Sequence, residues 1–401
     1  MRRYIKGLCF AFLIAFGPVP ATAGELSYFP AGEWPQTPAV PPPSVSSGSV
    51  VPVPELSALP AYAFSGKADI EGLIESAVRA STSSVEVAVY GFTLPRVAQA
   101  LADARARGVR VRVIMNESHL FTPRRSEQIQ QLLDAGVEMR SLRGVGRYGI
   151  MHNKLGIYDG KVVSAGSFNW AVTANEANSE NAVFIADPEV TASYRAYFEW
   201  MWGLARPSAE GPAEPVAAYP PPPACGARPL DFNGALLPRC TFSPGGDTEK
   251  DIAAALDFAR ETADIAVFSF YSQTIADAVL NAHKRGVKVR VLTDRVQASQ
   301  SDVGKLFMDA GVPFRWSQGF AGKGVMHNKF AVLDGKLLMT GSFNWSVNAQ
   351  QNNFENEYYS ADPALAAAFA AQFGDLFDAA ETPTPEDLAK ARREALRLSG
   401  R

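Results

Sequence analysis

Short apolar runs rich in β-branched residues alternate along the chain with stretches of helical periodicity. In RVAQALADARARGVRVRVIMN, apolar residues first recur every three or four positions and then, after Gly108, every second position. That change of period predicts a helix that ends through glycine and leads into a strand. HKRGVKVRVLTD, which contains Gly286, repeats the change. This alternation predicts an α/β fold with a parallel or mixed sheet covered by helices.

The same succession of segments occurs twice. SSVEVAVYGF, LLDAGVEM and AGSFNW in residues 61–205 correspond to TADIAVFSFY, FMDAGVPF and TGSFNW in residues 242–380. The offset between corresponding positions is constant early in the blocks and constant again from the DAG tripeptides onward, with a single change between these regions. One loop of different length accounts for that change. Such extended self-similarity predicts an internal duplication.

The segments outside the two blocks have different compositions. Residues 1–23 combine a basic start, the apolar run LCFAFLIAF and a small-residue end, which is typical of a secretory signal peptide. We predict cleavage near Ala23 and a secreted or periplasmic protein; an uncleaved anchor is the alternative. Residues 24–60 are predicted to be a Pro-rich spacer, residues 206–241 a Pro-rich linker, and residues 381–401 a C-terminal helical tail.

Charge and cysteine usage narrow the possible functions. The formal net charge of −3 would become −6 on loss of the basic first segment, which disfavours strong nonspecific binding to nucleic acid. Cys9 lies in the signal segment, whereas Cys225 and Cys240 lie in the linker. We interpret this pair as a structural disulfide. A two-cysteine metal site is the alternative, but no histidine lies close in sequence.

The tetrapeptide MHNK occurs at 151–154 and again at 326–329, in a chain with only 4 histidines. Each copy is followed by a predicted strand and an Asp-Gly turn, at Asp159 and Asp334. If the strand includes the histidine, His152 and Lys154 share one face, because side chains in a strand alternate. His327 and Lys329 would do the same in the second block.

Further polar residues follow each MHNK at equal spacing. Glu180 follows His152 at the same interval at which Glu355 follows His327, so we expect each carboxylate to orient the imidazole of its own block. Between them, two Gly-Ser-x-Asn stretches offer hydroxyl and amide groups from Ser167, Asn169, Ser342 and Asn344.

Lysine and asparagine donors suit phosphate oxygens, and histidine can attack phosphorus or protonate a leaving alkoxide. One block supplies only one such histidine, so a two-step reaction requires the two blocks to face each other across a pseudo-twofold axis. A zinc site of two His and two Glu is the alternative, but a lysine beside each histidine is a poor neighbour for a dication.

The doubled pattern H-x-K-x4-D-x6-G-S-x-N resembles the motif of the phospholipase D superfamily. GSFNW followed by N-x-E-N looks most similar to the branch with bacterial secreted nucleases and mitochondrial cardiolipin hydrolases. The resemblance implies two tandem α/β/α sandwich repeats with the active site at their interface, and no cofactor or metal. It also implies roles for particular residues: His152 as nucleophile, His327 as general acid and later base, Lys154, Lys329, Asn169 and Asn344 as phosphoryl ligands assisted by Ser167 and Ser342, and Glu180 and Glu355 as partners of the imidazoles.

Several residues have simpler interpretations. Asp159 and Asp334 belong to the motif but are predicted to be structural, as hairpin residues. Ser167 and Ser342 could instead cap helices that begin near Trp170 and Trp345, and we expect both tryptophans in the core. His119 and His283 lie outside the motif and are predicted at the surface.

We therefore predict a secreted phosphodiesterase that hydrolyses or transfers a phosphodiester through a phosphohistidine, with phospholipid as the preferred substrate. The alternative is a metal-independent endonuclease acting on DNA or RNA. Four apolar residues would insert into a lipid surface or stack on bases: Leu120, Phe121, Trp316 and Phe320. A binding module without activity is disfavoured, because a scaffold needs no second set of these polar residues. We expect a monomer with both half-sites in one chain, and peripheral contact with a membrane.

Overall fold

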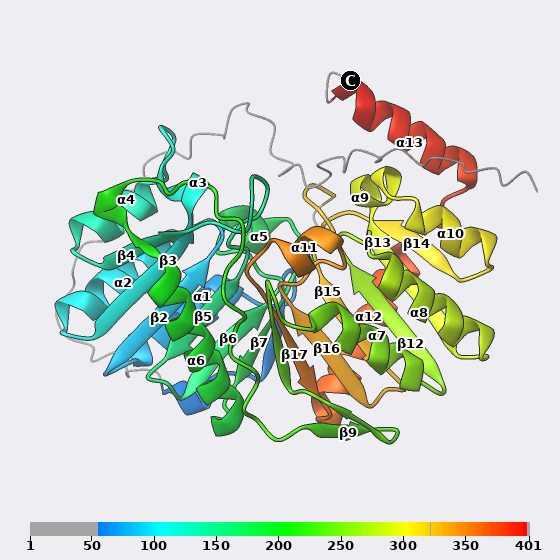
Figure 1. The fold of residues 1–401 in the computed structure, drawn as a ribbon, viewed down its shortest axis with the longest axis horizontal. Coiled ribbons are helices and arrows are strands. Elements are labelled where there is room, and N and C mark those ends of the chain that lie inside the picture. Colours follow the sequence, from blue (N-terminus) through cyan, green and yellow to red (C-terminus); the bar gives the residue numbers. More distant parts are fainter. Residues whose placement is uncertain (1–54, 321, 399–401) are drawn as a thin grey trace, which may run out of the picture. The chain divides into compact units, whose positions relative to one another are not determined.

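The computed structural model describes residues 55–320 and 322–398. The predicted signal peptide and most of the predicted spacer lie outside this part of the chain. The described residues form two mixed sheets, each flanked by helices, together with one small hairpin (Figure 1). Each sheet is built by one of the two predicted repeats, so the α/β prediction is confirmed.

The first sheet has eight strands in the order β1-β7-β6-β5-β2-β3-β4-β8. The pairs β2–β3 and β3–β4 are parallel and the other pairs are antiparallel. The strands are β1 (Tyr62–Phe64), β2 (Ser84–Val89), β3 (Arg110–Asn116), β4 (Glu138–Leu142), β5 (Lys154–Tyr158), β6 (Val162–Gly166), β7 (Asn181–Ile185) and β8 (Arg206–Pro207). The helices of this half are α1 (Ile70–Ala80), α2 (Pro95–Ala106), α3 (Glu117–Leu120), α4 (Glu127–Asp134), α5 (Val172–Glu176) and α6 (Pro188–Leu204).

The second sheet has seven strands in the order β11-β17-β16-β15-β12-β13-β14, which matches the first sheet without β8. Its strands are β11 (Cys240–Ser243), β12 (Thr262–Val267), β13 (Lys288–Asp294), β14 (Phe314–Ser317), β15 (Lys329–Leu333), β16 (Leu337–Gly341) and β17 (Glu355–Ser360). Its helices are α7 (Thr248–Phe258), α8 (Gln273–Lys284), α9 (Arg295–Gln300), α10 (Val303–Asp309), α11 (Val347–Gln351), α12 (Pro363–Ala379) and α13 (Pro385–Leu398).

The segment predicted as a linker is partly ordered secondary structure. It includes β8, which pairs with β4, the short helix η2 (Ser208–Glu210), and the hairpin of β9 (Leu230–Phe232) and β10 (Ala235–Leu237). A second short helix, η1 (Leu56–Ala58), lies in the described end of the predicted spacer. Cys225 and Cys240 form the predicted disulfide. The second sheet begins at Cys240, two residues before the predicted start of the repeat, because proline-rich segments can still supply edge strands.

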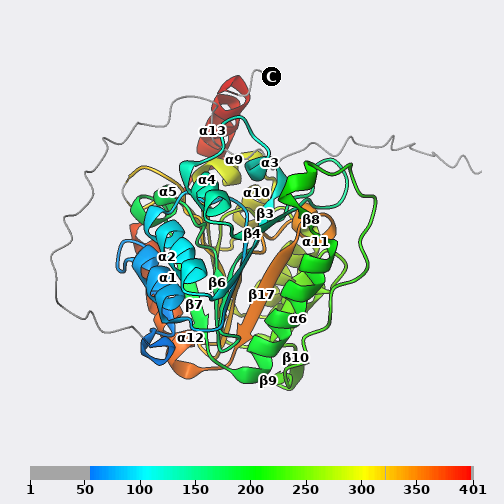
Figure 2. The ribbon, with the colours of Figure 1, turned by 90° about the vertical axis from the view of Figure 1, so that its left-hand side faces the viewer.

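One hydrophobic core joins the two sheets. It contains side chains from the middle strands of both, such as Leu155 of β5 and Phe330 of β15, and from the long helices α6 and α12. Separate cores fill the other side of each sheet beneath α1 and α2 and beneath α7 and α8. Figure 2, turned by 90° from Figure 1, shows α1 and α2 on one side of the first sheet and α6 on the other. Burial of these apolar side chains from both sheets in one core stabilises the packing of the two halves against each other.

The predicted hairpins are present in both halves, with three residues rather than two between the last paired residues. Tyr158 pairs with Val162, and Leu333 pairs with Leu337. Asp159 and Asp334 both have positive φ, at 52° and 54°, which the preceding β-strand and following glycine accommodate. None of the helices within the described ranges is long and apolar enough to cross a membrane.

Candidate active site

Each MHNK segment lies against the opposite half of the molecule. The His152 N–H donates to the carbonyl of Phe354 at 3.0 Å, and the His327 N–H donates to the carbonyl of Ser179 at 2.9 Å. The predicted strand that was to include the histidine begins only at the lysine, at Lys154 and Lys329. The histidines therefore lie just before β5 and β15, at the point where each segment forms hydrogen bonds with the opposite repeat.

The two histidines are paired with carboxylates across the repeats. His152 Nδ1 lies 2.8 and 2.9 Å from the two carboxylate oxygens of Glu355, and His327 Nδ1 lies 2.9 Å from Glu180 Oε2. The expectation that each glutamate serves the histidine of its own repeat is therefore wrong. Within a repeat, the strand that begins at or just after the glutamate (β7 or β17) is separated from the strand that follows the histidine (β5 or β15) by a third strand, β6 or β16.

The two carboxylates are held by different neighbours. Ser342 Oγ donates to Glu355 Oε2 at 2.6 Å, and Asn353 Nδ2 donates to Glu355 Oε1 at 3.1 Å. Glu180 Oε1 instead accepts one bond, from Asn178 Nδ2 at 3.3 Å. Ser167, which corresponds to Ser342, accepts from the backbone N–H of Asn181 at 2.9 Å. These contacts fix the carboxylates and, through them, the tilt of both imidazole rings.

Both lysines are buried beside their own histidines. Lys154 Nζ donates to the His152 carbonyl at 2.5 Å, and Lys329 Nζ donates to the His327 carbonyl at 2.9 Å. Lys154 Nζ also lies 5.8 Å from the ring centre of Tyr90, while Lys329 Nζ lies 5.0 Å from that of Phe268. Two buried ammonium groups give the site the local positive charge that a phosphoryl group requires, although the chain as a whole is acidic.

Asn169 and Asn344 occupy matching positions after β6 and β16. The Oδ1 atoms of both are buried and accept no hydrogen bond from the part of the chain that the structure describes. The roles assigned to Asn169, Asn344, Ser167 and Ser342 as phosphoryl ligands remain predictions. Since both serine hydroxyls are buried and bonded within the protein, they support neighbouring groups in this structure. They do not cap α5 or α11, whose N-cap residues are Ala171 and Ser346.

The third residue of each MHNK also contributes to the site. Asn356 Nδ2 donates to Asn153 Oδ1 at 2.7 Å, and Asn181 Nδ2 donates to Asn328 Oδ1 at 2.9 Å. Each pair again joins one half to the other, and all four residues are fully buried. The repeated Asn of MHNK and the Asn after each glutamate were the sequence signal for these contacts, which the interpretation of the motif overlooked.

Burial favours the neutral forms of two groups in the site. It lowers the pKa of the His327 imidazole; Glu180 opposes this effect in part, and Lys329 adds to it. Burial likewise raises the pKa of the Glu355 carboxyl, and Lys154 and Ser342 offset only part of the increase. Both shifts limit the charge of the buried site in the absence of a substrate.

Asp159 and Asp334 are bonded to the backbone of neighbouring loops. Asp159 accepts from the N–H groups of residues 82–84 at 2.8 to 3.0 Å, and Asp334 accepts from those of residues 260–262 at 2.7 to 3.2 Å. Burial opposes ionisation of Asp159, but these donors outweigh it and lower its pKa to about 2. The geometry supports the predicted structural role of both residues.

The remaining histidines are not at the surface as predicted. His119 is half-buried, with its ring 4.5 Å from that of Tyr90, which in turn lies 5.4 Å from the ring of His152. His283 is also half-buried, on α8. The ring of Tyr90, from a segment remote in sequence, covers part of His119, which the sequence around His119 does not indicate. Trp170 and Trp345 lie in the core, as predicted.

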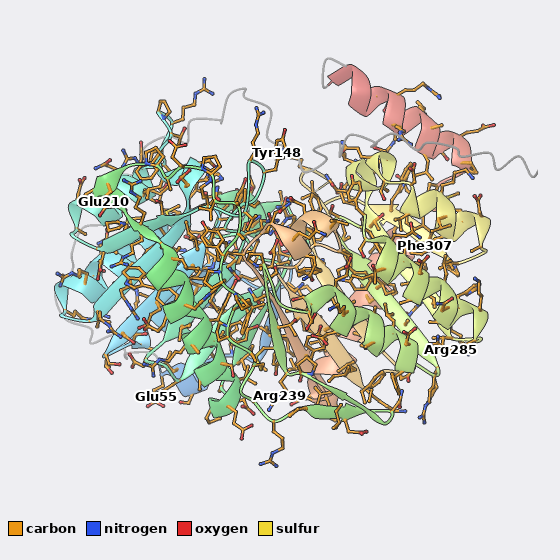
Figure 3. All side chains as sticks on the ribbon, in the orientation of Figure 1. Glu55, Tyr148, Glu210, Arg239, Arg285 and Phe307 are labelled. Carbon is orange, nitrogen blue, oxygen red and sulfur yellow. A yellow bond between two sulfur atoms is a disulfide. The ribbon has the colours of Figure 1, made fainter. Side chains whose placement is uncertain are left out.

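The loop residues proposed to insert into lipid or stack on bases are mostly covered. Leu120 and Trp316 are buried and Phe121 is half-buried, so only Phe320 is exposed, with 45% of its surface accessible. Tyr148, labelled in Figure 3, is the more exposed aromatic residue, at 57%. Leu120 and Trp316 were misassigned because they do not lie in loops: Leu120 ends α3 and Trp316 lies in β14, and both pack into the cores of their halves.

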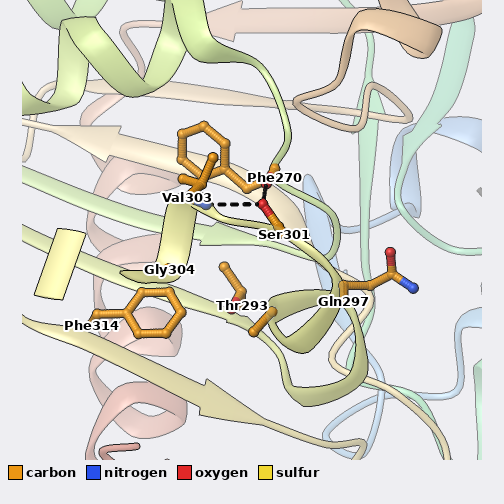
Figure 4. Close-up of a pocket in the computed structure, with 8 residues that line it drawn as sticks. Phe270, Thr293, Gln297, Ser301, Val303, Gly304 and Phe314 are labelled. Atoms are coloured by element: carbon orange, nitrogen blue, oxygen red, sulfur yellow. Dashed lines mark hydrogen bonds between the residues drawn. The ribbon is translucent and has the colours of Figure 1, made fainter. Parts of the chain in front are cut away.

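Two other kinds of site were considered among the described residues, a metal site and a cavity. No group of three or more His, Cys, Asp or Glu side chains in these ranges is arranged to hold a metal ion. The cavity in Figure 4, of about 10 Å³, is lined by Phe270, Thr293 and neighbouring residues of the second half. It has room for no more than one water and contains none of the motif residues.

Comparison with known proteins identifies a family. A family model described as "Cardiolipin synthase, PLD-like domain" matches residues 73–202 and 252–377. The mitochondrial cardiolipin hydrolase of Danio rerio is 33% identical over 196 residues, which cover 48% of this chain and 85% of that protein. The mitochondrial cardiolipin hydrolase of Chlamydomonas reinhardtii is 39% identical over 150 residues, or 36% of this chain, and the match spans 64% of its length.

A solved structure matches both halves together. The phosphatidylserine synthase of Haemophilus influenzae superposes with a TM-score of 0.59 at 12% identity, over 85% of this chain and 94% of that one. At this identity the likeness concerns the fold alone. It agrees with two α/β repeats placed side by side in one chain.

Proposed function

This chain belongs to the phospholipase D superfamily, and we propose that it is a phosphodiesterase that acts through a phosphohistidine intermediate. The observation that carries the proposal is the pair of His–Glu contacts formed across the repeats, at 2.8 and 2.9 Å. Because each half-site is completed by the other repeat, one chain holds both the nucleophile and the acid that the reaction requires.

The geometry orients both imidazoles for these roles. When Nδ1–H of a histidine donates to a glutamate, Nε2 carries the free lone pair in the neutral ring and a proton in the charged ring. In the proposed first step, Nε2 of His152 attacks phosphorus, the bond from phosphorus to the leaving oxygen breaks, and Nε2–H of His327 protonates that oxygen. In the second step, His327 accepts a proton from water, and the resulting hydroxide displaces His152 from phosphorus. The assignment of attack to His152 rests on resemblance to the family.

Lys154 and Lys329 are proposed to bind the non-bridging phosphoryl oxygens, together with Asn169 and Asn344. Their charge and hydrogen bonds would stabilise the pentacoordinate transition state more than the ground state. The substrate anion would also raise the pKa of His327, which burial lowers in the free protein. Binding of the phosphodiester would thus favour the protonated form that the general acid needs.

We propose a phospholipid as the preferred substrate, with peripheral contact at the membrane surface. Both curated relatives described above are named cardiolipin hydrolases, and the net charge of −3 disfavours tight binding to a polyanion such as DNA. Exposed Tyr148 and Phe320, on the two loops that precede the MHNK segments, are suited to contact a lipid interface. The same two rings could stack on bases, so an endonuclease is the second candidate.

One set of assays separates the candidates. The purified protein would be given cardiolipin or phosphatidylcholine vesicles and, separately, single- and double-stranded nucleic acid, all with chelator. We expect headgroup release or transfer from lipid, and loss of at least about 10³-fold in kcat in both His152→Ala and His327→Ala. His283→Ala is the matched control, a half-buried histidine outside the site. Turnover of nucleic acid alone would replace the lipid proposal, and full activity in either site variant would refute the shared site.

We also propose export and a monomeric state. The Cys225–Cys240 disulfide supports export, because disulfides persist in oxidising compartments. N-terminal sequencing of the protein from the periplasm or medium should find a new terminus near residue 24. Light scattering should give the mass of one chain. Retention of the predicted signal peptide, or a dimer whose dissociation abolishes activity, would contradict these two proposals.

A further inference from the structure

One row of residues crosses the second sheet beside the active site. Phe330 pairs with Thr340, so Lys329 lies opposite Gly341 when this register is continued by one residue. Gly341 pairs in turn with Glu357. The three residues occupy neighbouring positions on β15, β16 and β17, on the same face of the sheet. Only the glycine in the middle separates the lysine of the motif from a carboxyl group that the mechanism does not use.

The carboxyl group of Glu357 occupies the space above Gly341. A Cβ atom placed on Gly341 would lie 2.6 Å from Glu357 Oε2, closer than any side chain permits. Gly341 belongs to the GSFNW stretch, and its lack of a side chain allows Glu357 to extend across the strand toward Lys329. A Cβ atom there would come still closer to the backbone carbonyl of Asn356, and one on Gly166 would meet the matching carbonyl of Asn181 at 2.6 Å. The backbone therefore requires glycine in both repeats, and only the second repeat uses the space beside it for an acid.

Glu357 is almost completely buried, with 1% of its surface exposed, and its Oε2 accepts no hydrogen bond from the residues that the structure describes. Burial raises the pKa of its carboxyl well above the ordinary value; Glu355 adds to the increase and Lys329 reduces it. The nearby groups that ionise are Lys329 and Glu355, and two buried tyrosines, Tyr194 and Tyr359. A buried acid of this kind is usually retained for a specific contact.

The polar character continues away from the site along the same face. Tyr359 follows Glu357 by two residues on β17, and its buried hydroxyl lies near that of Thr241. Asp251 on α7 interacts electrostatically with Tyr359, and burial raises the pKa of Asp251 to about 6. Lys329, Glu357, Tyr359 and Asp251 therefore form a polar column from the active site to a half-buried helix.

The first half has no such column. The corresponding row is Lys154, Gly166 and Ala182, and Gly166 pairs with Ala182 in the same register. Phe184 stands where the second half has Tyr359, and Leu73 stands where it has Asp251. Two sheet positions and one helix position thus carry ionisable side chains in the second repeat and apolar ones in the first. The two sheets have the same strand order, so if the fold itself required an acid at this position, both repeats would carry one. The acid at position 357 therefore has a reason that is specific to the second repeat.

We propose that Glu357 is a positioning residue of the second half-site, which restrains Lys329 and makes the two half-sites functionally unequal. This inference rests on the proposed phosphodiesterase function and adds to it a residue outside the repeated motif. A long lysine side chain loses precision unless its neighbours limit the conformations it can adopt. The carboxyl group of Glu357, in the same row across Gly341, would limit the conformations of Lys329 so that the ammonium group meets a phosphoryl oxygen in one geometry.

The test uses variants that give the second half the residues of the first. Glu357→Ala introduces the alanine found at position 182, and Glu357→Gln keeps the volume and polarity of the side chain but cannot ionise. Tyr158→Phe is the structural control, because it removes a buried hydroxyl that bonds to Ser164 at 2.9 Å in the first half. The full-length protein would be assayed with a chromogenic phosphodiester from pH 5 to 9, with thermal unfolding measured in parallel.

We expect Glu357→Ala to lower kcat about tenfold, with a smaller change in KM, and Glu357→Gln to recover most of that loss near neutral pH. The pH profile of kcat should also change in both variants, because neither can gain or lose a proton at this position. A merely structural residue would move the unfolding temperature without moving the profile. If Glu357→Ala does not fold, Glu357→Gln decides the question through its pH profile.

Three results would overturn the inference. They are kcat within twofold of wild type across the pH range in Glu357→Ala, an equal loss of kcat in Tyr158→Phe, or an unchanged profile in Glu357→Gln. Failure of the inference is distinguishable from failure of the proposed function. In the first case the wild-type protein hydrolyses the phosphodiester and the variants behave like it, whereas in the second the wild-type protein itself has no activity.

Discussion

The two half-sites share their main contacts but hold their carboxylates differently. In both, lysine donates to the carbonyl of the histidine two residues before it, and the imidazole meets a glutamate of the opposite repeat. Glu355 faces His152 with both oxygens and is held by Ser342 and Asn353. Glu180 faces His327 with one oxygen and, within the described part of the chain, its carboxylate accepts one further bond, from Asn178. A repeated motif therefore preserves the reacting groups while their supporting bonds diverge.

The serines of the motif illustrate this divergence. Ser342 donates to the carboxylate of Glu355, while Ser167, at the same position of GSFNW, bonds to Asn181 and to no carboxylate among the described residues. A difference of one hydrogen bond at a carboxylate changes how firmly the paired imidazole is oriented. Variants that remove matching residues from the two halves should therefore have unequal effects, and those effects measure the asymmetry directly.

The largest effect is expected from the two glutamates. Glu355→Ala should lower kcat by about 10³-fold and Glu180→Ala by about 10²-fold, because each leaves an imidazole without its buried partner and Glu355 is the more firmly held. Histidine NMR should show that Glu355→Ala perturbs His152 and that Glu180→Ala perturbs His327. Perturbation of the histidine in the same repeat would contradict the exchanged pairing.

A smaller effect is expected at the two hairpins, where the acids of the motif bond to backbone N–H groups. Asp159→Asn should reduce the free energy of unfolding by about 1–2 kcal/mol, and Asp334→Asn by a similar or smaller amount, since each keeps only part of its hydrogen bonds. Chemical denaturation of both variants would measure this. Activity of the folded variants should stay near that of wild type; a loss as large as that of a histidine variant would assign these acids to the chemistry.

The smallest effects should appear in the pH dependence of stability, with opposite signs in the two half-sites. The pKa of His327 is lowered from its ordinary value of 6.5, so the unfolded chain binds more protons below that pH, and stability falls as the pH decreases. The pKa of Glu355 is raised from 4.5, so the folded protein keeps a proton that the unfolded chain loses, and stability falls as the pH increases above that value.

Denaturation from about pH 4.5 to pH 7 would separate these contributions. Relative to wild type, His327→Gln should gain stability as the pH decreases, and Glu355→Gln should gain stability as the pH increases. His283→Gln serves as a control outside the site. Parallel curves for the two site variants would show that burial does not affect the two groups in opposite directions.

Much of the fold was predictable because it depends on local patterns. The change of hydrophobic period after Gly108 and Gly286 indicated helix followed by strand, and both pairs of elements are present. The core positions of Trp170 and Trp345 followed from their aromatic character. Predictions about exposure failed for Leu120 and His119, because their covering comes from segments that are remote in sequence or from the fold of the loop itself.

The sequence by itself determined which groups form the candidate active site. Duplication of MHNK, GSFNW and the following glutamate identified the histidines, lysines and carboxylates from spacing alone. Only the tertiary structure decided which carboxylate meets which histidine, and that Glu357 lies beside Lys329 across Gly341. Spacing along the chain shows which residues belong to the same repeat. Contacts between the repeats depend instead on how the two sheets pack against each other. That packing cannot be derived from the order of residues within either repeat.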